Sequence, residues 1–104
     1  MIAVETREEV LDRLVREAGP LLAFGVHRLR LFGSFAREEA SPGSDVDLLV
    51  DFSAGAKTFD NFMGLAEFLE DTLKRKVELV TAEALSPYLR PSILAEAQDV
   101  PLVA

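Results

Sequence analysis

The sequence has no cysteine and a single histidine, His27, among its 104 residues. These absences exclude disulfide frameworks, thiolate zinc sites, cysteine nucleophiles and histidine-rich metal sites. Basic residues are also scarce, because eleven Lys and Arg stand against eighteen Asp and Glu and give a formal net charge of −7. That charge has the wrong sign for direct binding of duplex DNA through its phosphates. Any chemistry must therefore depend on carboxylates, hydroxyls and amides.

Long hydrophobic runs are missing as well. No apolar run approaches the length that spans a bilayer, and the first ten residues have no basic region that leads into an apolar stretch. We therefore expect a cytoplasmic protein that does not associate with membranes. With 104 residues and 49% hydrophobic composition, the chain fits one domain, residues 1–104, with a single core.

The hydrophobic periodicity and the turn signals predict an alternation of helices and strands. Thr6 and Glu9 form the pattern of a capping box at the first helix, and Gly19 with Pro20 is expected to end that helix. Helices are predicted at 6–18, 34–39, 59–74 and 92–97, a helical turn at 82–85, a tight turn at 41–44, strands at 26–32, 45–52 and 76–80, and an apolar tail after residue 97.

This order of elements indicates an α+β fold in which helices pack on a small sheet. The connection 34–44 is barely long enough for a parallel crossover, so we expect a mixed β-sheet. On the helix 59–74 the predicted apolar stripe is formed by Phe59, Phe62, Met63, Ala66, Leu69 and Leu73. Phe68 then projects outward as a candidate partner contact, although a single exposed aromatic is commonly without function.

Two carboxylates, Asp45 and Asp47, share one side of the second predicted strand, with their roots roughly 7 Å apart. Two anions held together in a partly desolvated place raise a pKa or recruit a cation, and hard oxygen ligands favour Mg²⁺. The alternative is that both acids simply face water, as acids on exposed faces commonly do.

Gly33 and Ser34 lie where the first predicted strand passes into a helix. Glycine allows a close approach to the backbone, and the first amides of a helix attract phosphate, so this pair is a candidate triphosphate cradle. Ser34 could instead be only an N-cap. A cradle next to an acidic strand would hold a nucleoside triphosphate through Mg²⁺, and two metal ions need a third acid, for which Glu78 on the strand 76–80 is the candidate. The alternative for Glu78 is an exposed strand acid paired with Lys76 or another base.

These residues resemble a family signature. Gly33 and Ser34, ten intervening residues, then Asp45 and Asp47, and an acid on a later strand are similar to the pattern of the polymerase beta type nucleotidyltransferases. The stretch 31–52, LFGSFAREEASPGSDVDLLVDF, resembles that of their smallest members, the minimal nucleotidyltransferases of prokaryotes.

The resemblance implies a nucleotidyltransferase fold and a role for each matching residue. Gly33 and Ser34 would bind the triphosphate of ATP, and the three acids would ligate two Mg²⁺ ions, with Glu78 activating the acceptor hydroxyl. The family more often has Asp at this third position. It also often has Gly where this chain has Glu38. Arg37 is therefore expected either to contact phosphate or to pair with Glu38, Glu39 or Asp51.

The resemblance also implies a partner. A chain of this length has no room for the acceptor domain that such enzymes usually carry. In the minimal family the acceptor resembles that of a toxin–antitoxin pair, in which AMP passes from ATP to a tyrosine hydroxyl of a HEPN toxin encoded nearby, in a possible hetero-oligomer. The alternatives are an antitoxin that neutralises its partner by binding alone and a transferase acting on a small molecule. Tyr88 could contact the adenine or pack the tail.

Overall fold

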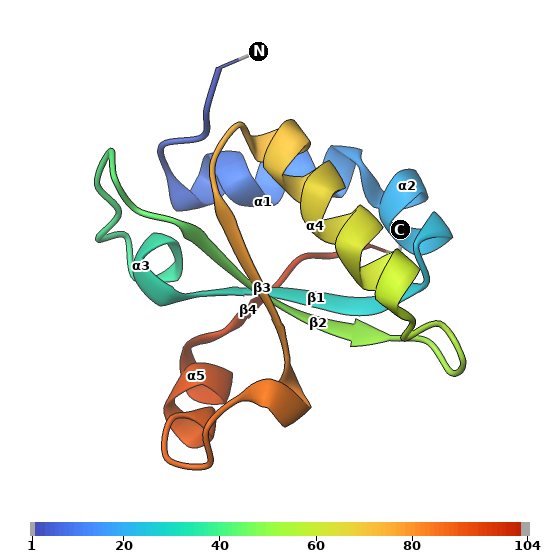
Figure 1. Cartoon of the computed structure of the whole chain (residues 1–104). Coiled ribbons are helices and arrows are strands. Elements are labelled where there is room, and N and C mark those ends of the chain that lie inside the picture. Colours follow the sequence, from blue (N-terminus) through green and yellow to red (C-terminus); the bar gives the residue numbers. More distant parts are fainter. Residues whose placement is uncertain (1, 103–104) are drawn as a thin grey trace.

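The computed structural model describes residues 2–102 and is built around one four-stranded sheet (Figure 1). The strand order is β3-β2-β1-β4. The strands are β1 (Val26–Phe32), β2 (Val46–Phe52), β3 (Val77–Thr81) and the two-residue β4 (Gln98–Asp99). β1 is antiparallel to both β2 and β4, whereas β2 and β3 are parallel. The expected mixed sheet in an α+β fold is confirmed.

Helices lie on both faces of this sheet. The elements are α1 (Arg7–Arg16), α2 (Ala18–Ala23), α3 (Gly33–Ala36), α4 (Phe59–Leu73), the 3₁₀ turn η1 (Ala82–Ala84) and α5 (Arg90–Glu96). In Figure 1, α1, α2 and α4 lie together on one side of the sheet, and α5 lies on the other. In residues 2–102, none of the helices has the length and apolar character that crossing a membrane requires.

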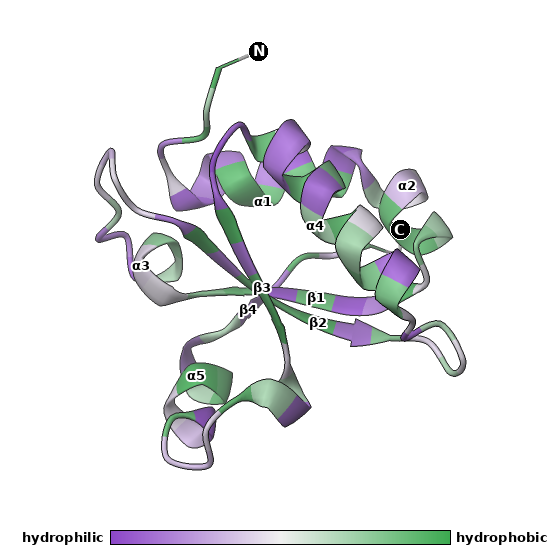
Figure 2. Ribbon diagram, in the orientation of Figure 1, coloured by the Kyte–Doolittle hydropathy of each residue, from purple (hydrophilic) through white to green (hydrophobic). Residues whose placement is uncertain are grey.

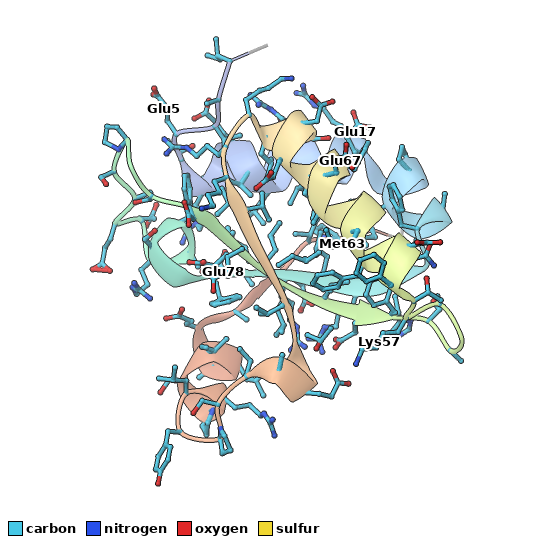
Figure 3. The ribbon with its side chains drawn as sticks, viewed as in Figure 1. Glu5, Glu17, Lys57, Met63, Glu67 and Glu78 are labelled. Carbon is cyan, nitrogen blue, oxygen red and sulfur yellow. The ribbon has the colours of Figure 1, made fainter. Side chains whose placement is uncertain are left out.

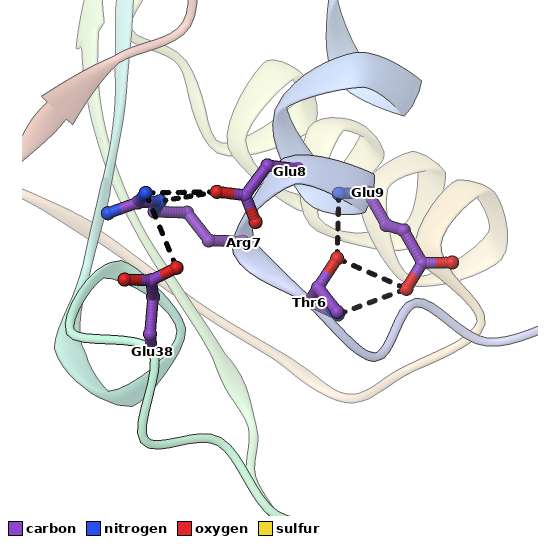
Figure 4. Close-up of polar contacts among 5 residues, drawn as sticks. All are labelled: Thr6, Arg7, Glu8, Glu9 and Glu38. Atoms are coloured by element: carbon purple, nitrogen blue, oxygen red, sulfur yellow. Dashed lines mark hydrogen bonds and ion pairs between the residues drawn. The ribbon is translucent and has the colours of Figure 1, made fainter.

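Side-chain caps fix the starts of the two long helices. Thr6 accepts a hydrogen bond from the Glu9 amide, and the Glu9 carboxylate accepts one from the Thr6 amide, so the predicted capping box is present (Figure 4). Thr58 caps α4 in the predicted place by accepting from the Asn61 amide. Figure 4 also shows Arg7 between Glu8 and Glu38, an ion pair that links α1 to the end of α3.

The predicted end of the first helix is wrong. α1 stops at Arg16, and Gly19 and Pro20 lie inside the separate helix α2. Both positions fall in the first turn of α2, where the amides have no helical acceptor, so a proline removes no hydrogen bond there. The strand β4 was not predicted either. It forms at the start of the expected apolar tail, whose last two positions, 103–104, lie outside the described residues.

The core lies between the sheet and α1, α2 and α4, and it corrects the predicted face of α4. Leu65, Leu69 and Leu73 are the buried residues of that helix. Phe68 does not face outward, because its ring packs on Phe24 with centroids 5.7 Å apart. Two residues of the predicted stripe are exposed instead, Phe59 at 78% and Met63 at 49%. Met63 is labelled on α4 in Figure 3. Helical spacing located an apolar stripe, but the packing of α4 against α1 and β3 decided which side of that stripe is covered.

Candidate functional site

Asp47 and Glu78 are brought together by the parallel pairing of β2 and β3. The two residues are direct partners in the register of these strands. Side chains at paired positions of neighbouring strands project from the same face of a sheet, and the strands lie about 4.8 Å apart. Glu78 is exposed, and Figure 3 places it on β3 on the side of the molecule where α3 lies. Asp45 precedes β2 by one residue and is half-buried.

The Asp47 carboxylate is the most strongly perturbed acid of this region. Burial, together with the charge of the neighbouring Glu78 and a hydrogen bond with it, raises the pKa of Asp47 to about 6. The charge of Asp45 acts in the same direction, while the charge of Arg37 opposes it. The three acids therefore share a region in which negative charge is excessive, and a proton or a cation bound there would relieve the repulsion.

Gly33 lies against Asp47. It follows Phe32, which is the register partner of Asp47 across β1 and β2, and its backbone has a φ of +76°. A Cβ atom built on Gly33 would overlap the Asp47 Oδ2 atom and lie 2.9 Å from Cγ. Only glycine therefore combines this backbone conformation with the close approach of the carboxylate. The glycine–serine turn and the acidic strand form one continuous site.

Ser34 and Arg37 belong to α3, the short helix that begins at this turn. Ser34 is half-buried in the first turn of α3, and Arg37 is the residue that ends it. The Arg37 guanidinium donates to Glu39 through Nε at 2.7 Å and to Glu96 through Nη1 at 3.1 Å. Of the partners expected for Arg37, only Glu39 is found; Glu38 pairs with Arg7 and Asp51 pairs with Arg30.

Glu96 is the residue of this region that the sequence did not reveal. Its Oε2 atom accepts a hydrogen bond from the Gly33 amide at 2.7 Å, and its carboxylate also pairs with Arg37. One carboxylate thus occupies a backbone donor and a guanidinium that were both assigned to a phosphate. Sixty-three positions separate Glu96 from Gly33. The placement comes from the unpredicted strand β4 just beyond Glu96, which pairs with β1 and brings the end of α5 to α3.

Two other residues that the sequence analysis singled out lie outside the acidic site. Tyr88 is 93% exposed, so it does not pack against the tail as one alternative proposed. Phe68 is partly buried against the core. In its place, Phe59 and Met63 line a groove of about 440 Å³ whose other wall includes Leu79 and Val80 of β3.

The chemistry of the donor set suits a hard divalent cation. The site offers carboxylate oxygens, which Mg²⁺ prefers, and their mutual repulsion would be relieved by a cation. Within residues 2–102, no three acid or histidine side chains are already grouped closely enough to hold a metal by themselves. Asp47 and Glu78 are the pair that the backbone brings together, and phosphate oxygens of a nucleotide are the natural additional ligands for Mg²⁺.

Comparison with known proteins gives this geometry a context. A model of the nucleotidyltransferase domain matches residues 7–100. The protein adenylyltransferase MntA of Thermococcus cleftensis is 35% identical over 96 residues, which cover 92% of this chain and 94% of that protein. A solved structure described as a minimal nucleotidyltransferase superposes with a TM-score of 0.69 at 38% identity, covering 85% of this chain and 93% of that one.

A third similarity concerns the fold alone. The structure of a tri-AMPylated HEPN toxin from Shewanella oneidensis in complex with its MNT antitoxin superposes with a TM-score of 0.60. The identity is 18%, and the alignment covers 92% of this chain and 72% of that one. The expected nucleotidyltransferase fold is therefore confirmed by solved structures as well as by the domain match.

Proposed function

This chain belongs to the nucleotidyltransferase domain family, and from that premise we propose that it transfers AMP from ATP to a hydroxyl of a partner protein. The acceptor is a tyrosine of a HEPN toxin encoded nearby, and the transfer makes the chain an antitoxin in the cytoplasm. The observation that carries this proposal is the contact of the Gly33 turn with Asp47, which in turn is paired with Glu78.

Each residue has a part in the proposed reaction. The Ser34 hydroxyl and backbone, with Gly33 and Arg37, hold the triphosphate tail. Asp45, Asp47 and Glu78, together with phosphate oxygens of the nucleotide, would hold two Mg²⁺ ions, and these ions would supply positive charge to the α-phosphate and the leaving pyrophosphate. The acceptor oxygen forms a bond to the α-phosphorus, and the bond from that phosphorus to the β-phosphate oxygen breaks. Glu78 takes the hydroxyl proton, and its exposure leaves room for a protein acceptor.

The choice of a protein acceptor is supported by the relatives. MntA of Thermococcus cleftensis is a protein adenylyltransferase of nearly the same length as the aligned region. The structural neighbour from Shewanella oneidensis is an antitoxin bound to a HEPN toxin that carries AMP. A hetero-oligomer with the toxin would supply the acceptor hydroxyl from outside the chain.

The test is incubation of the chain with the HEPN protein encoded beside it, labelled ATP and Mg²⁺. Label is expected to pass to the HEPN protein with the wild-type chain and to be lost with Asp45→Asn and with Asp47→Asn. Asp60→Asn is the matched control, because it removes the same charge from an exposed position in the first turn of α4. Neutralisation of the toxin without label, and equally by both site variants, would instead identify an antitoxin that acts by binding alone. Label that reaches only a small hydroxyl compound would point to the small-molecule alternative.

A further inference from the structure

The loop that carries Asp45 into the site has no regular secondary structure of its own. α3 ends at Ala36 and β2 begins at Val46, so Asp45 lies at the end of a nine-residue connection. Within this connection the Ser44 amide donates to the Ser41 carbonyl at 3.0 Å, and the Ser44 Oγ atom accepts from the Ser41 amide at 2.9 Å. These bonds shape the turn, but they do not attach it to the rest of the molecule.

Arg75 makes that attachment. Its Nη1 atom lies 3.2 Å from the carbonyl oxygen of Ser41, 2.9 Å from that of Pro42 and 3.0 Å from that of Ser44. Its Nε atom donates to the Val4 carbonyl at 2.7 Å. A guanidinium presents five donors in a rigid plane, so one side chain can join two separate stretches of backbone.

The same guanidinium also contacts α3. Its Cζ atom lies 5.1 Å from the ring centroid of Phe35, which is fully buried one residue after Ser34. This is a cation–π contact of the usual geometry. Arg75 therefore touches the helix that carries the glycine–serine turn and the loop that carries the first acid.

The backbone on the other side of Asp45 is fixed by the neighbour of Arg75. The Val46 amide donates to the Lys76 carbonyl at 2.9 Å, and two residues later the same segment supplies Glu78. Lys74 sets the direction of this segment, because it adopts the left-handed conformation at the end of α4 with a φ of +55°. Asp45 is thus held on both sides by residues 75 and 76, immediately before the strand that carries Glu78.

We propose that Arg75 is a positioning residue for the nucleotide and metal site, which it serves by holding the backbone of Asp45 in register with α3 and β3. The part of this inference that concerns catalysis rests on the proposed function. Arg75 does not reach the acids itself, and its bonds are to carbonyl oxygens and an aromatic ring.

The chain offers a matched control in Arg13. Its Nη1 atom donates to the carbonyl oxygens of Ile2 at 2.7 Å and Thr72 at 3.2 Å, so it also ties the N-terminal segment to a second stretch of backbone. Neither bond involves the loop 37–45 or the three acids. Loss of Arg13 therefore removes comparable contacts while the loop 37–45 keeps its own.

The experiment compares Arg75→Lys with Arg13→Lys in the full chain by thermal unfolding, amide hydrogen exchange and calorimetric titration with ATP and Mg²⁺. Lysine keeps the charge but cannot form the planar fork. We expect Arg75→Lys to lose exchange protection at the Val46 amide and to weaken binding of Mg·ATP about tenfold, since small displacements of positioned groups are costly. Arg13→Lys should change the melting temperature by a similar amount, with affinity altered less than about twofold, as for sites that share no contact.

A second variant separates a local role from a general loss of stability. A groove of about 300 Å³ opens beside the guanidinium and is lined by Ala40, Ser41 and Pro42, so a free guanidinium ion can reach the position. Millimolar guanidinium is expected to restore Mg·ATP affinity in Arg75→Ala and to leave the affinity of Arg13→Ala unchanged.

Unchanged exchange at the Val46 amide in Arg75→Lys, or Mg·ATP affinity that falls equally in both lysine variants, would overturn the inference. A wild-type chain that binds no Mg·ATP would instead refute the proposed function, while the exchange measurement still decides the role of Arg75.

Discussion

Gly33 lies in the unit β1–α3–β2 and is contacted by Glu96 of the segment 82–99. The two parts of the chain are held in the molecule by different forces. Leu29 and Leu31 of β1 and Leu48 and Val50 of β2 are fully buried. By contrast, α5 has no buried residue, although Figure 2 colours part of it as hydrophobic. Leu94 of α5 and Leu89 just before it are exposed. The end of α5 is attached to α3 through Glu96.

This difference indicates which part of the site is rigid and which part can move. Gly33, Ser34 and the two aspartates belong to the buried unit or directly border it, and Glu78 lies on β3, which pairs with β2. The carboxylate that occupies the Gly33 amide belongs to the lightly packed helix. Segments with few buried apolar contacts open at low free energy. A nucleotide that binds at Gly33 is therefore expected to displace Glu96 rather than to rearrange the strands.

The largest effect is expected from Gly33→Ala, which disrupts the rigid part of the site. The new Cβ would overlap the Asp47 carboxylate, and alanine would be strained at a φ of +76°. We expect a loss of transferase activity of about 100-fold, the order that follows from misplacing a reacting group by about 1 Å. Strain and overlap together should lower the free energy of unfolding by about 2 kcal/mol. Labelled AMP transfer and urea unfolding measure the two quantities.

Gly55→Ala separates the two contributions. Gly55 also has a positive φ, +78°, but a Cβ there meets nothing within 4 Å. This variant should therefore lose stability through strain alone and keep its activity. Equal loss of activity in both variants would mean that the contact between Gly33 and Asp47 is not what positions the site.

A smaller effect is expected from the titration of Asp47. Its pKa is about 6 in the folded chain and 3.8 without perturbation. Because the folded pKa is the higher one, the stabilisation from the bound proton is complete below pH 4 and is lost as the pH rises through 6. Asn cannot ionise, so Asp47→Asn should be more stable than the wild type above pH 6. The full shift is discounted for solvent screening at this half-exposed group, which leaves about 1 kcal/mol.

Urea unfolding of both chains between pH 4.5 and 8, without divalent cations, tests this expectation. The gap in stability should close as the pH falls toward 4.5, and Mg²⁺ at pH 8 should stabilise the wild type more than Asp47→Asn. A gap that is constant across the pH range would show that the substitution acts through packing and not through the charge of Asp47.

The smallest effect is expected from Glu96→Gln, which weakens the contact between α5 and the Gly33 turn. The variant removes the negative charge that occupies Arg37 and weakens the acceptor for the Gly33 amide. Since partly exposed ion pairs contribute at most about 1 kcal/mol, ATP binding should tighten about threefold to fivefold. Calorimetric titration with ATP and Mg²⁺ provides the measurement.

Glu39→Gln is the matched control for charge. Glu39 pairs with the same guanidinium at 2.7 Å but does not touch Gly33. If displacement from Gly33 matters, Glu96→Gln must tighten binding more than Glu39→Gln does. Weaker binding in Glu96→Gln would reverse the conclusion and make Glu96 a support of the site.

Local signals were sufficient for most of the helices and strands. The caps at Thr6 and Thr58, the strand 26–32 and the helix from Phe59 are present as predicted. These features depend on residues within a few positions of one another, so their pattern is visible in the chain itself. The prediction failed at Phe68, because helical spacing does not say against which neighbours a helix packs.

By itself, then, the sequence determined the order of helices and strands, the acids of the two strands, and the glycine–serine turn between them. These follow from side-chain alternation, capping and backbone freedom, which act over short stretches of chain. Only the tertiary structure decided that Glu96 lies on Gly33, that Arg75 holds the loop before Asp45, and that Asp47 faces Glu78 in register. Those contacts join residues 31 to 63 positions apart, and it is the burial of the core and the pairing of the strands that bring them together.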